Sequence, residues 1–225
     1  MRNLRLLFVL AVAAALLAAC GSAAQPAKPP TAAPTTAPQS NLRVLFQDDF
    51  SNPKSGWDTE HEKEAVIEYK NGMYRMWLNY PHTVMWANPH LDFSDVRVEV
   101  SATKAGGTDD NQFGLICRYQ DENNFYFFII SSDGYYGIGK SKNGKQTLLT
   151  GHGNMEYSKF INRGHATNRL RADCVGPSLA FYVNGQRLVR VNDSDFTKGD
   201  VGLLIGTFTE PETEVYYDNF VVYQP

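Results

Sequence analysis

The sequence lacks an excess of positive charge. Its length is sufficient for one large domain. It has 21 Lys and Arg residues against 24 Asp and Glu residues, so its formal net charge is −3 at pH 7. Nucleic acids favour a protein surface with clustered Lys and Arg, because these side chains neutralise phosphates. No basic stripe is present in the sequence, so we expect no nucleic-acid partner.

Common catalytic motifs are also missing. The sequence contains no G-x-S-x-G nucleophile elbow, no H-E-x-x-H zinc motif and no phosphate-binding P-loop. Its five histidines are scattered rather than spaced as metal ligands. None of these reaction types is therefore indicated by the sequence.

Helical periodicity is missing from Leu42 onward, and short alternating runs take its place. These runs recur about every 8 to 15 residues and are separated by turn signals, which is typical of a β-sandwich or barrel. Asn-Gly pairs stand at 71–72, 143–144 and 184–185, and such pairs favour tight hairpin turns. We therefore expect one all-β domain over residues 42–225.

The N-terminus has the layout of an export signal. Two arginines precede an apolar run from Leu6 to Ala19, which is shorter than the ~20 residues that a transmembrane helix needs. The tetrad Leu-Ala-Ala-Cys that ends at Cys20 resembles the lipobox of bacterial lipoproteins. The resemblance implies a signal peptide over 1–19 and a lipid on Cys20 that anchors the protein in the membrane. An ordinary signal with an incidental cysteine is the alternative.

A linker follows the expected lipid anchor. Residues 20–41 consist mainly of Ala, Pro and Thr, and this composition cannot bury enough apolar area to fold. We expect a disordered spacer that holds the domain away from the membrane, with the protein exported to the outer, extracytoplasmic face of the bacterial cell membrane.

Cysteine is rare, and this shapes the expected covalent structure. The sequence has three Cys residues, and lipidation of Cys20 leaves Cys117 and Cys174 as an even pair in an oxidising compartment. Each of the two shares a strand face with apolar residues, so both point toward the expected core. A disulfide bond between them is favoured, and two separate buried thiols are the alternative.

The order of the motifs is recognisable. The stretches "DDFSNPKSGW", "FGLICRYQDENNFYFFIISSDGYYGIGK", "NRLRADCVGPSLAFYVNGQRL" and "VYYDNFVVY" resemble the concanavalin A-like, laminin G-like jelly roll. They are especially similar to bacterial surface domains related to 3-keto-disaccharide hydrolases. The resemblance implies a jelly-roll β-sandwich of two antiparallel sheets. This fold hosts lectins, glycosidases and adhesion modules, so the resemblance does not select an activity.

Glycosidases of the laminarinase and lichenase type in this superfamily carry two glutamates in an E-x-D-x-x-E pattern. One carboxyl protonates the leaving oxygen while the other attacks or activates water. The glutamates from Glu60 to Glu214 show no such spacing. The sequence therefore argues against this hydrolase chemistry, although a divergent enzyme stays open.

The resemblance also implies a structural calcium ion that bridges the first and last strands. Asp218 matches the aspartate of the terminal strand, Gly72 matches the early glycine turn, and Asp49 adds a nearby carboxylate. Oxygen-rich sites of this kind suit a hard cation. The alternative is that Asp218 accepts hydrogen bonds from the N-terminal backbone and no metal is present.

The strand "NFYFFII" is apolar on both faces, whereas a half-buried strand alternates. If Phe125, Phe127 and Ile129 fill the core, Tyr126 and Phe128 lie on the open face. Sugar rings expose apolar C–H faces, so such aromatics beside charged groups suit a glycan. The candidate ligand-binding residues are Trp77, Arg118, Tyr126, Phe128, Arg171 and Asp173. The alternative is that loops cover this face.

From these features we expect a surface lipoprotein whose domain binds carbohydrate or other cell-envelope ligands without catalysis. A divergent 3-keto-disaccharide-like hydrolase is the first alternative. A structural or protein-interaction module is the second.

Overall fold

The structure is a computed structural model, and it describes residues 42–225. The expected signal peptide of residues 1–19, the lipid-attached Cys20 and the rest of the linker up to residue 41 lie outside the described residues. Over residues 42–225 there is no helix with the length and apolar character needed to cross a membrane.

The described chain folds into strands joined by turns and loops. The strands are β1 (Val44–Asp48), β2 (Glu60–Glu62), β3 (Ala65–Lys70), β4 (Met73–Leu78), β5 (Val84–Ala87), β6 (Val96–Gly107), β7 (Asn111–Asp121), β8 (Asn124–Ile130), β9 (Tyr135–Lys142), β10 (Lys145–Leu148), β11 (Glu156–Tyr157), β12 (Thr167–Val175), β13 (Ser178–Val183), β14 (Gln186–Asn192), β15 (Asp200–Thr207) and β16 (Thr213–Tyr223).

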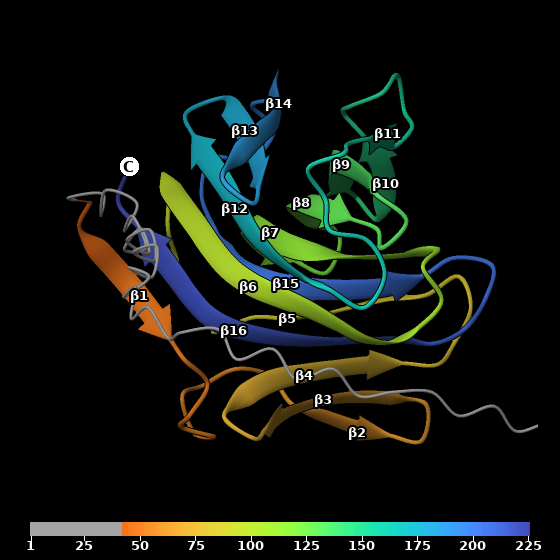
Figure 1. The fold of residues 1–225 in the computed structure, drawn as a ribbon. Helices are drawn as coiled ribbons and strands as arrows, with labels where there is room; N and C mark the ends of the chain where they lie inside the picture. The colour runs from red at the N-terminus through yellow and green to blue at the C-terminus, as the bar shows by residue number, and fades with distance from the viewer. Residues whose placement is uncertain (1–41) are drawn as a thin grey trace, which may run out of the picture. The chain divides into compact units, whose positions relative to one another are not determined.

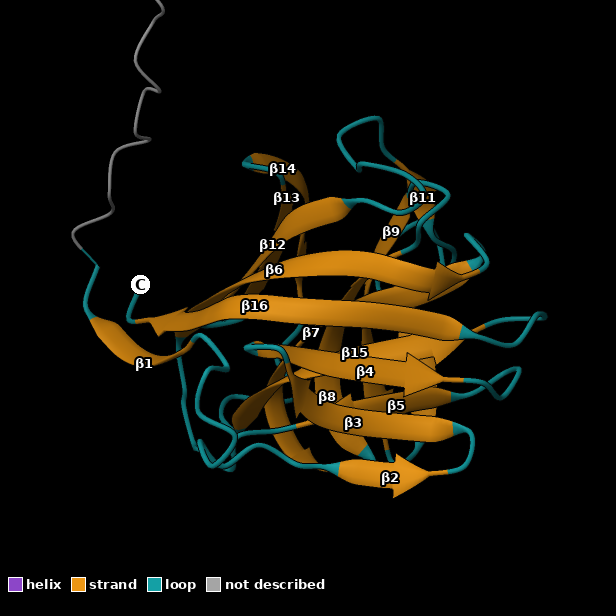
Figure 2. Ribbon diagram, turned by 60° about the horizontal axis from the view of Figure 1, so that its bottom comes forward, coloured by secondary structure: helices purple, strands orange, loops and turns teal. Residues whose placement is uncertain are grey.

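The strands form two antiparallel sheets that lie face to face (Figures 1 and 2). The nine-stranded sheet has the order β14-β13-β12-β6-β16-β4-β3-β2, and β1 pairs with β16. The seven-stranded sheet has the order β10-β9-β8-β7-β15-β5, and β11 pairs with β9. The expected β-sandwich of two antiparallel sheets is confirmed.

Alternation of side chains builds the core between the sheets. In β6, Val96, Val98 and Val100 point inward and are buried, whereas the residues between them are polar and only partly covered. Asn-Gly turns connect β3 to β4, β9 to β10 and β13 to β14, and both residues of each turn have positive φ. These are the tight hairpins that the sequence predicts.

Strand β8 is apolar on both faces, but its two faces are the reverse of the expected ones. Tyr126, Phe128 and Ile130 lie in the core between the sheets, and Phe125, Phe127 and Ile129 belong to a second apolar cluster outside it. The expected exposure of Tyr126 and Phe128 is wrong, because both side chains are fully buried. Phe128 packs edge-on against Phe181 of the opposite sheet.

The disulfide bond between Cys117 and Cys174 is present. Cys117 lies on β7 of the seven-stranded sheet and Cys174 on β12 of the nine-stranded sheet. Both residues are fully buried, so the bond links the two sheets through the core.

Arg118 is buried as well, which corrects its expected place on an open surface. A bulge interrupts the pairing of β7 after Cys117, and Arg118 there has a φ of 53°. This left-handed backbone breaks the alternation, so the side chain turns toward the interior. Its guanidinium donates to the carbonyl oxygens of Ser94 (3.3 Å) and Phe196 (2.9 Å) and pairs with Asp95 (3.1 Å).

Candidate functional site

The outer face of the seven-stranded sheet carries an apolar surface that we call the aromatic face. It is built around the cluster of Ile116, Phe125, Phe127, Ile129 and Leu204, which is nearly buried. Partly exposed side chains surround this cluster, namely Val84, Trp86, Tyr119, Leu148 and Met155. A sheet face turned away from the core is normally polar, so the apolar character of this face makes it a candidate contact region. The five central residues are at most 6% exposed, so the accessible part of the face consists mainly of the side chains around them.

Glycines on neighbouring strands let the aromatic side chains lie close to the sheet. A Cβ atom on Gly139 of β9 would lie 2.3 Å from Cζ of Phe127, so the Phe127 ring occupies the space above that glycine. A Cβ atom on Gly137 would lie 2.9 Å from a methyl group of Leu148 in the same way. The alternate glycines of β9 therefore shape the floor of the aromatic face.

Three strands contribute rings to a continuous row. The ring centroid of Phe125 lies 5.5 Å from that of Trp86 on β5, 5.6 Å from that of Tyr119 on β7 and 6.3 Å from that of Phe127. The Trp86 indole N–H donates to the Tyr119 hydroxyl at 3.4 Å, which fixes the two rings relative to each other. The row is a preformed aromatic platform.

One end of the row opens into a cavity of about 480 Å³, which we call the aromatic cavity. Its lining residues are Gln112, Phe127, Ile129, Gln146, Thr147, Leu148, Gly153, Met155 and Phe208. Amide and hydroxyl groups thus stand beside an apolar floor, and this combination is common in small-molecule sites. None of these lining residues is acidic or basic.

The other end of the row opens into a second cavity of about 420 Å³, which we call the acid cavity. It is lined by His90, Leu91, Asp92, Tyr119, Gln120, Lys198, Gly199 and Asp200. Asp200 stands opposite Tyr119 in the pairing of β15 with β7, and the inward residues of β15 alternate with it. Asp200 therefore belongs to the same outer face as Tyr119.

Asp200 is buried, with 7% of the residue exposed. Burial raises its pKa to about 6, and a hydrogen bond from the Val201 backbone N–H (2.8 Å) offsets part of this effect. A carboxyl group that exchanges its proton near neutral pH, inside a cavity, is a candidate functional group.

We predict that the Asp200→Asn substitution stabilises the protein at pH 7 by up to about 3 kcal/mol, the equivalent of a pKa shift of about two units. The folded-state pKa of about 6 lies above that of the unfolded chain, which is about 3.9. The unfolded state therefore loses this proton first, and the contribution of Asp200 to stability declines as pH rises from about 4 to about 6. Urea unfolding of both proteins at pH 4 and pH 7 measures this, and an equal difference at both pH values would contradict it.

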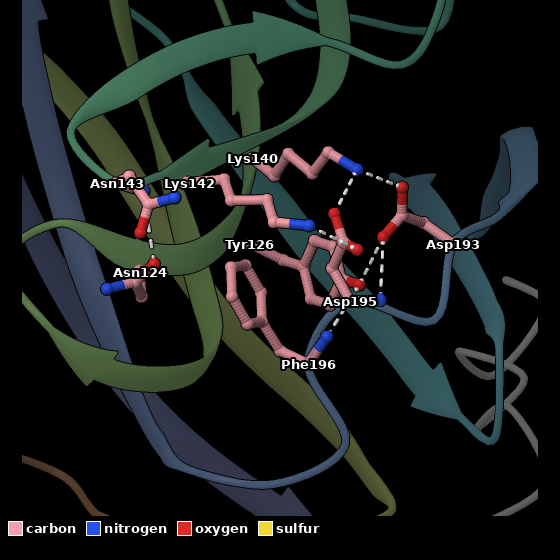
Figure 3. Close-up of polar contacts among 8 residues, drawn as sticks. All are labelled: Asn124, Tyr126, Lys140, Lys142, Asn143, Asp193, Asp195 and Phe196. Carbon is pink, nitrogen blue, oxygen red and sulfur yellow. Dashed lines mark hydrogen bonds and ion pairs between the residues drawn. The ribbon is translucent and has the colours of Figure 1, made fainter.

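Tyr126 is held in the interior by a polar network at the edge of the sandwich (Figure 3). Its hydroxyl donates to Asp193 (2.5 Å) and accepts from the Phe196 backbone N–H (3.1 Å). Lys140 pairs with Asp193 and, at 2.6 Å, with Asp195. These contacts tie β8 and β9 to the loop between β14 and β15, so the network holds this edge of the sandwich together.

The network also fixes the protonation of its members. Burial raises the pKa of the Tyr126 phenol to about 12, so it stays a donor at neutral pH. Burial opposes ionisation of Asp193, but hydrogen bonds from Lys140 and Tyr126 outweigh it, and the pKa of Asp193 lies below its ordinary value.

The remaining candidates from the sequence lie on the outer face of the nine-stranded sheet. The Arg171 guanidinium lies 4.1 Å from the Tyr182 ring centroid and pairs with Asp173, and Arg97 pairs with Asp173 at 3.1 Å. Trp77 lies on β4, which β6 and β16 separate from β12, under the guanidinium of Arg75. Trp77, Arg171 and Asp173 therefore do not meet the buried Arg118, Tyr126 and Phe128. The expected common binding floor is wrong, and a separate ligand role for the three partly exposed residues stays a prediction.

The residues expected to hold calcium do not meet in one place. Asp49 accepts hydrogen bonds from the backbone and hydroxyl of Ser51, and Asp218 pairs with Ser101 in the sheet. Gly72 lies in the turn between β3 and β4. No group of three or more acidic, His or Cys side chains that could hold a metal occurs in the described part of the chain.

One buried oxygen at this edge nevertheless fits a cation. Asp48 Oδ2 is buried without a hydrogen-bond partner, and Asp48 lines a cavity of about 400 Å³. Asp49, Asn52 and Asn219 line the same cavity, so oxygen ligands are available there. Gly72 and Asp218 are not among the lining residues.

Comparison with solved structures places the fold among known proteins. The carbohydrate-binding module CBM66 from Bacillus subtilis is similar with a TM-score of 0.62 and 16% identity, over 75% of this chain and 96% of that one. The catalytic domain of an endo-1,3-beta-glucanase (laminarinase) from Thermotoga petrophila RKU-1 has a TM-score of 0.57 and 8% identity, over 82% of this chain and 98% of that one. The fold is a concanavalin A-like jelly roll. This confirms the expected fold class.

A third similar structure is a Bacillus subtilis protein of unknown function with a galectin-like fold. It has a TM-score of 0.60 and 12% identity, over 81% of this chain and 96% of that one. No protein-family model matches the chain, and no curated protein sequence matches it. At these identities the likeness concerns the fold alone.

The residues that build the aromatic face were not among the sequence candidates. Phe127 was assigned to the core, and Trp86 and Asp200 were not singled out. A signal for Asp200 exists in "DVGLLIG", where Asp200 has the same parity as Gly202 and Leu204 and the opposite parity to Val201. This alternation separates the outward residues from the core residues of β15.

Proposed function

We propose that the protein is a lipoprotein on the outer face of the bacterial cell membrane and that its jelly-roll domain binds a glycan at the aromatic face. The observation that carries the proposal is the aromatic cavity, where the Phe127 ring stands beside Gln112, Gln146 and Thr147. A sugar ring has an apolar C–H face and a rim of hydroxyls. The aromatic platform matches the first, and the amide and hydroxyl groups match the second.

Two of the similar structures support a carbohydrate ligand. One is named as a carbohydrate-binding module and another as an endo-1,3-beta-glucanase. The lining of the aromatic cavity contains no carboxylate pair, and glycoside hydrolysis ordinarily needs one. This favours binding without catalysis at the aromatic cavity.

We predict that the Phe127→Leu substitution weakens glycan binding about tenfold, which corresponds to about 1.4 kcal/mol. Leucine removes the flat ring and keeps part of the apolar volume. Phe127 is also packed in the apolar cluster, so the variant loses some stability, and its affinity is measured on the folded protein at a temperature below its melting transition. A glycan array identifies the ligand, and titration calorimetry with that ligand then compares the variant with the wild type.

Trp77→Leu is the matched control, because Trp77 lies on the outer face of the other sheet. We expect its affinity to equal that of the wild type. If Trp77→Leu loses binding and Phe127→Leu keeps it, the ligand lies on the nine-stranded sheet. If no polysaccharide binds above background, the glycan proposal fails and a protein-interaction module becomes the better description.

A divergent hydrolase is the second candidate, and the acid cavity favours it. Asp200 would act as the general acid, because its pKa of about 6 leaves it partly protonated near neutral pH. His90, which pairs with Asp58 at 2.8 Å, would act as the base. Release of a reducing sugar from the bound glycan, abolished by Asp200→Asn, would establish this activity.

We also propose a structural calcium ion at the edge formed by β1 and β16, held by Asp48 and Asp49. Removing a bound ion destabilises the folded state by mass action, so we expect a chelator to lower the melting temperature by about 5 °C. Differential scanning fluorimetry with and without chelator measures this effect. A melting temperature that does not change would dismiss the ion.

A further inference from the structure

The acid cavity holds a buried carboxylate without a cationic partner. Asp200 accepts a hydrogen bond from the Val201 backbone N–H, and the backbones of Leu91 and His90 also act on its carboxyl. No Lys, Arg or His side chain in the described part of the chain forms an ion pair with it. A desolvated carboxylate of this kind gains strongly from a positive charge brought by a ligand.

The two cationic side chains of the cavity already have other partners. Lys198 pairs with Asp92 at 3.3 Å, and the His90 ring contacts Asp58 at 2.8 Å. The residues that line the cavity carry two carboxylates, Asp92 and Asp200, against one lysine and one histidine. Lys198 is engaged by Asp92, and His90 is engaged by Asp58, which lies outside the lining, so the Asp200 carboxylate is left to favour an added cation.

The wall of the cavity is suited to an organic cation. Tyr119 lines the cavity, and its ring also belongs to the aromatic row through its contact with Phe125. An ammonium group binds well where a carboxylate and the face of an aromatic ring meet, because both attract positive charge. The cavity of about 420 Å³ has the size of a site for one or two sugar units.

We propose that the acid cavity binds the primary ammonium group of an amino sugar through Asp200, at one end of a glycan that lies along the aromatic face. This proposal rests on the proposed function and names its ligand class as a glycan with free, unacetylated amines. Tyr119 connects the two regions, so a single chain contacts the ring of Phe127 at one end and Asp200 at the other.

The test compares three oligosaccharides of equal length, built from glucosamine, N-acetylglucosamine and glucose, by titration calorimetry at about pH 6.5, where Asp200 is mostly ionised. We expect the glucosamine oligomer to bind the wild type at least tenfold more tightly than its acetylated form, as expected for a desolvated ion pair. Acetylation removes the positive charge and leaves the ring unchanged, so it isolates the ammonium contact.

The Asp200→Asn variant should lose this preference and keep its affinity for the glucose oligomer. Asparagine retains an oxygen that accepts from the Val201 N–H and removes a desolvated charge, so the variant is expected to fold. The matched control is Asp110→Asn, which removes the same charge from the exposed turn between β6 and β7. The Asp110→Asn variant should keep the preference for glucosamine. If it loses that preference, long-range charge and not the acid cavity is responsible.

The outcomes separate this inference from the proposed function. If the glucose oligomer binds and the wild type shows no preference for glucosamine, the amino-sugar site is overturned and the glycan proposal stands. If glucosamine binds in an Asp200-dependent way and the Phe127→Leu variant binds every oligomer as the wild type does, the amino-sugar site stands and the aromatic face fails. If no oligomer binds, both are wrong.

Discussion

Removing the bond between Cys117 and Cys174 is expected to lower the free energy of unfolding by about 4 kcal/mol. The two residues are 57 positions apart, and a cross-link over a loop of this length restricts the unfolded chain by about that amount in the chain-entropy model. The double Cys117→Ala, Cys174→Ala variant should melt about 10 °C below the wild type. Thermal unfolding followed by circular dichroism measures the difference.

The location of the bond adds a kinetic expectation. Both cysteines are fully buried, so a reductant reaches the bond only when the sandwich opens. A reductant should therefore break the bond slowly in the native protein and rapidly in protein that is unfolded by urea. Each single alanine variant should lose as much stability as the double variant, because either one breaks the bridge. An unchanged melting temperature in the double variant would show that the bridge contributes nothing.

Replacing Arg118 by alanine is expected to cost about 3 kcal/mol of stability or more. The side chain is 1% exposed and fills space beside the core. Its loss leaves a cavity and frees the carbonyl oxygens of Ser94 and Phe196, which it otherwise satisfies. Urea unfolding of the variant measures the loss, and glycan affinity of the folded fraction should not change.

Arg169→Ala is the control for this prediction. The Arg169 guanidinium is largely exposed and pairs with Glu99 at 2.6 Å, so its removal should change stability by no more than about 0.5 kcal/mol. An Arg118→Ala variant that keeps full stability but loses glycan binding would contradict this prediction and support the ligand-binding role that the sequence indicates for Arg118.

Local patterns in the sequence were sufficient to predict the sandwich. Over residues 96–101, strand β6 alternates between valine and polar residues, so its inward face could be identified without knowledge of its neighbours. The Asn-Gly pairs fixed three hairpins, because few other dipeptides accept positive φ at both positions. The pairing of Cys117 with Cys174 followed from the expected export of the protein and from the inward parity of both residues.

The two faces of β8 could not be assigned in the same way. Both Phe127 and Phe128 are large and apolar, so alternation does not show which one meets the opposite sheet. The buried hydroxyl of Tyr126 is satisfied by Asp193, which lies 67 positions away in the chain, and no local pattern announces such a partner. The buried position of Arg118 was missed for a different reason, because a bulge changes the alternation of inward and outward side chains at that residue.

Asp200 illustrates a third kind of limit. Its place on the outer face can be read from alternation with Val201, but its burial depends on His90, Leu91 and Tyr119, which come from other segments. The raised pKa of Asp200 follows from this burial, so it is a consequence of tertiary packing.

The glycines beneath the aromatic face determine how deep the site is. Where Gly137 and Gly139 lie, the floor is made by side chains that lean in from Leu148 and Phe127, and one added methyl group would displace them. Related chains that exchange only these glycines for alanine would offer a shallower pocket on an unchanged scaffold. Ligand preference in this architecture can therefore diverge through steric changes of a single carbon atom, before any polar contact is gained or lost.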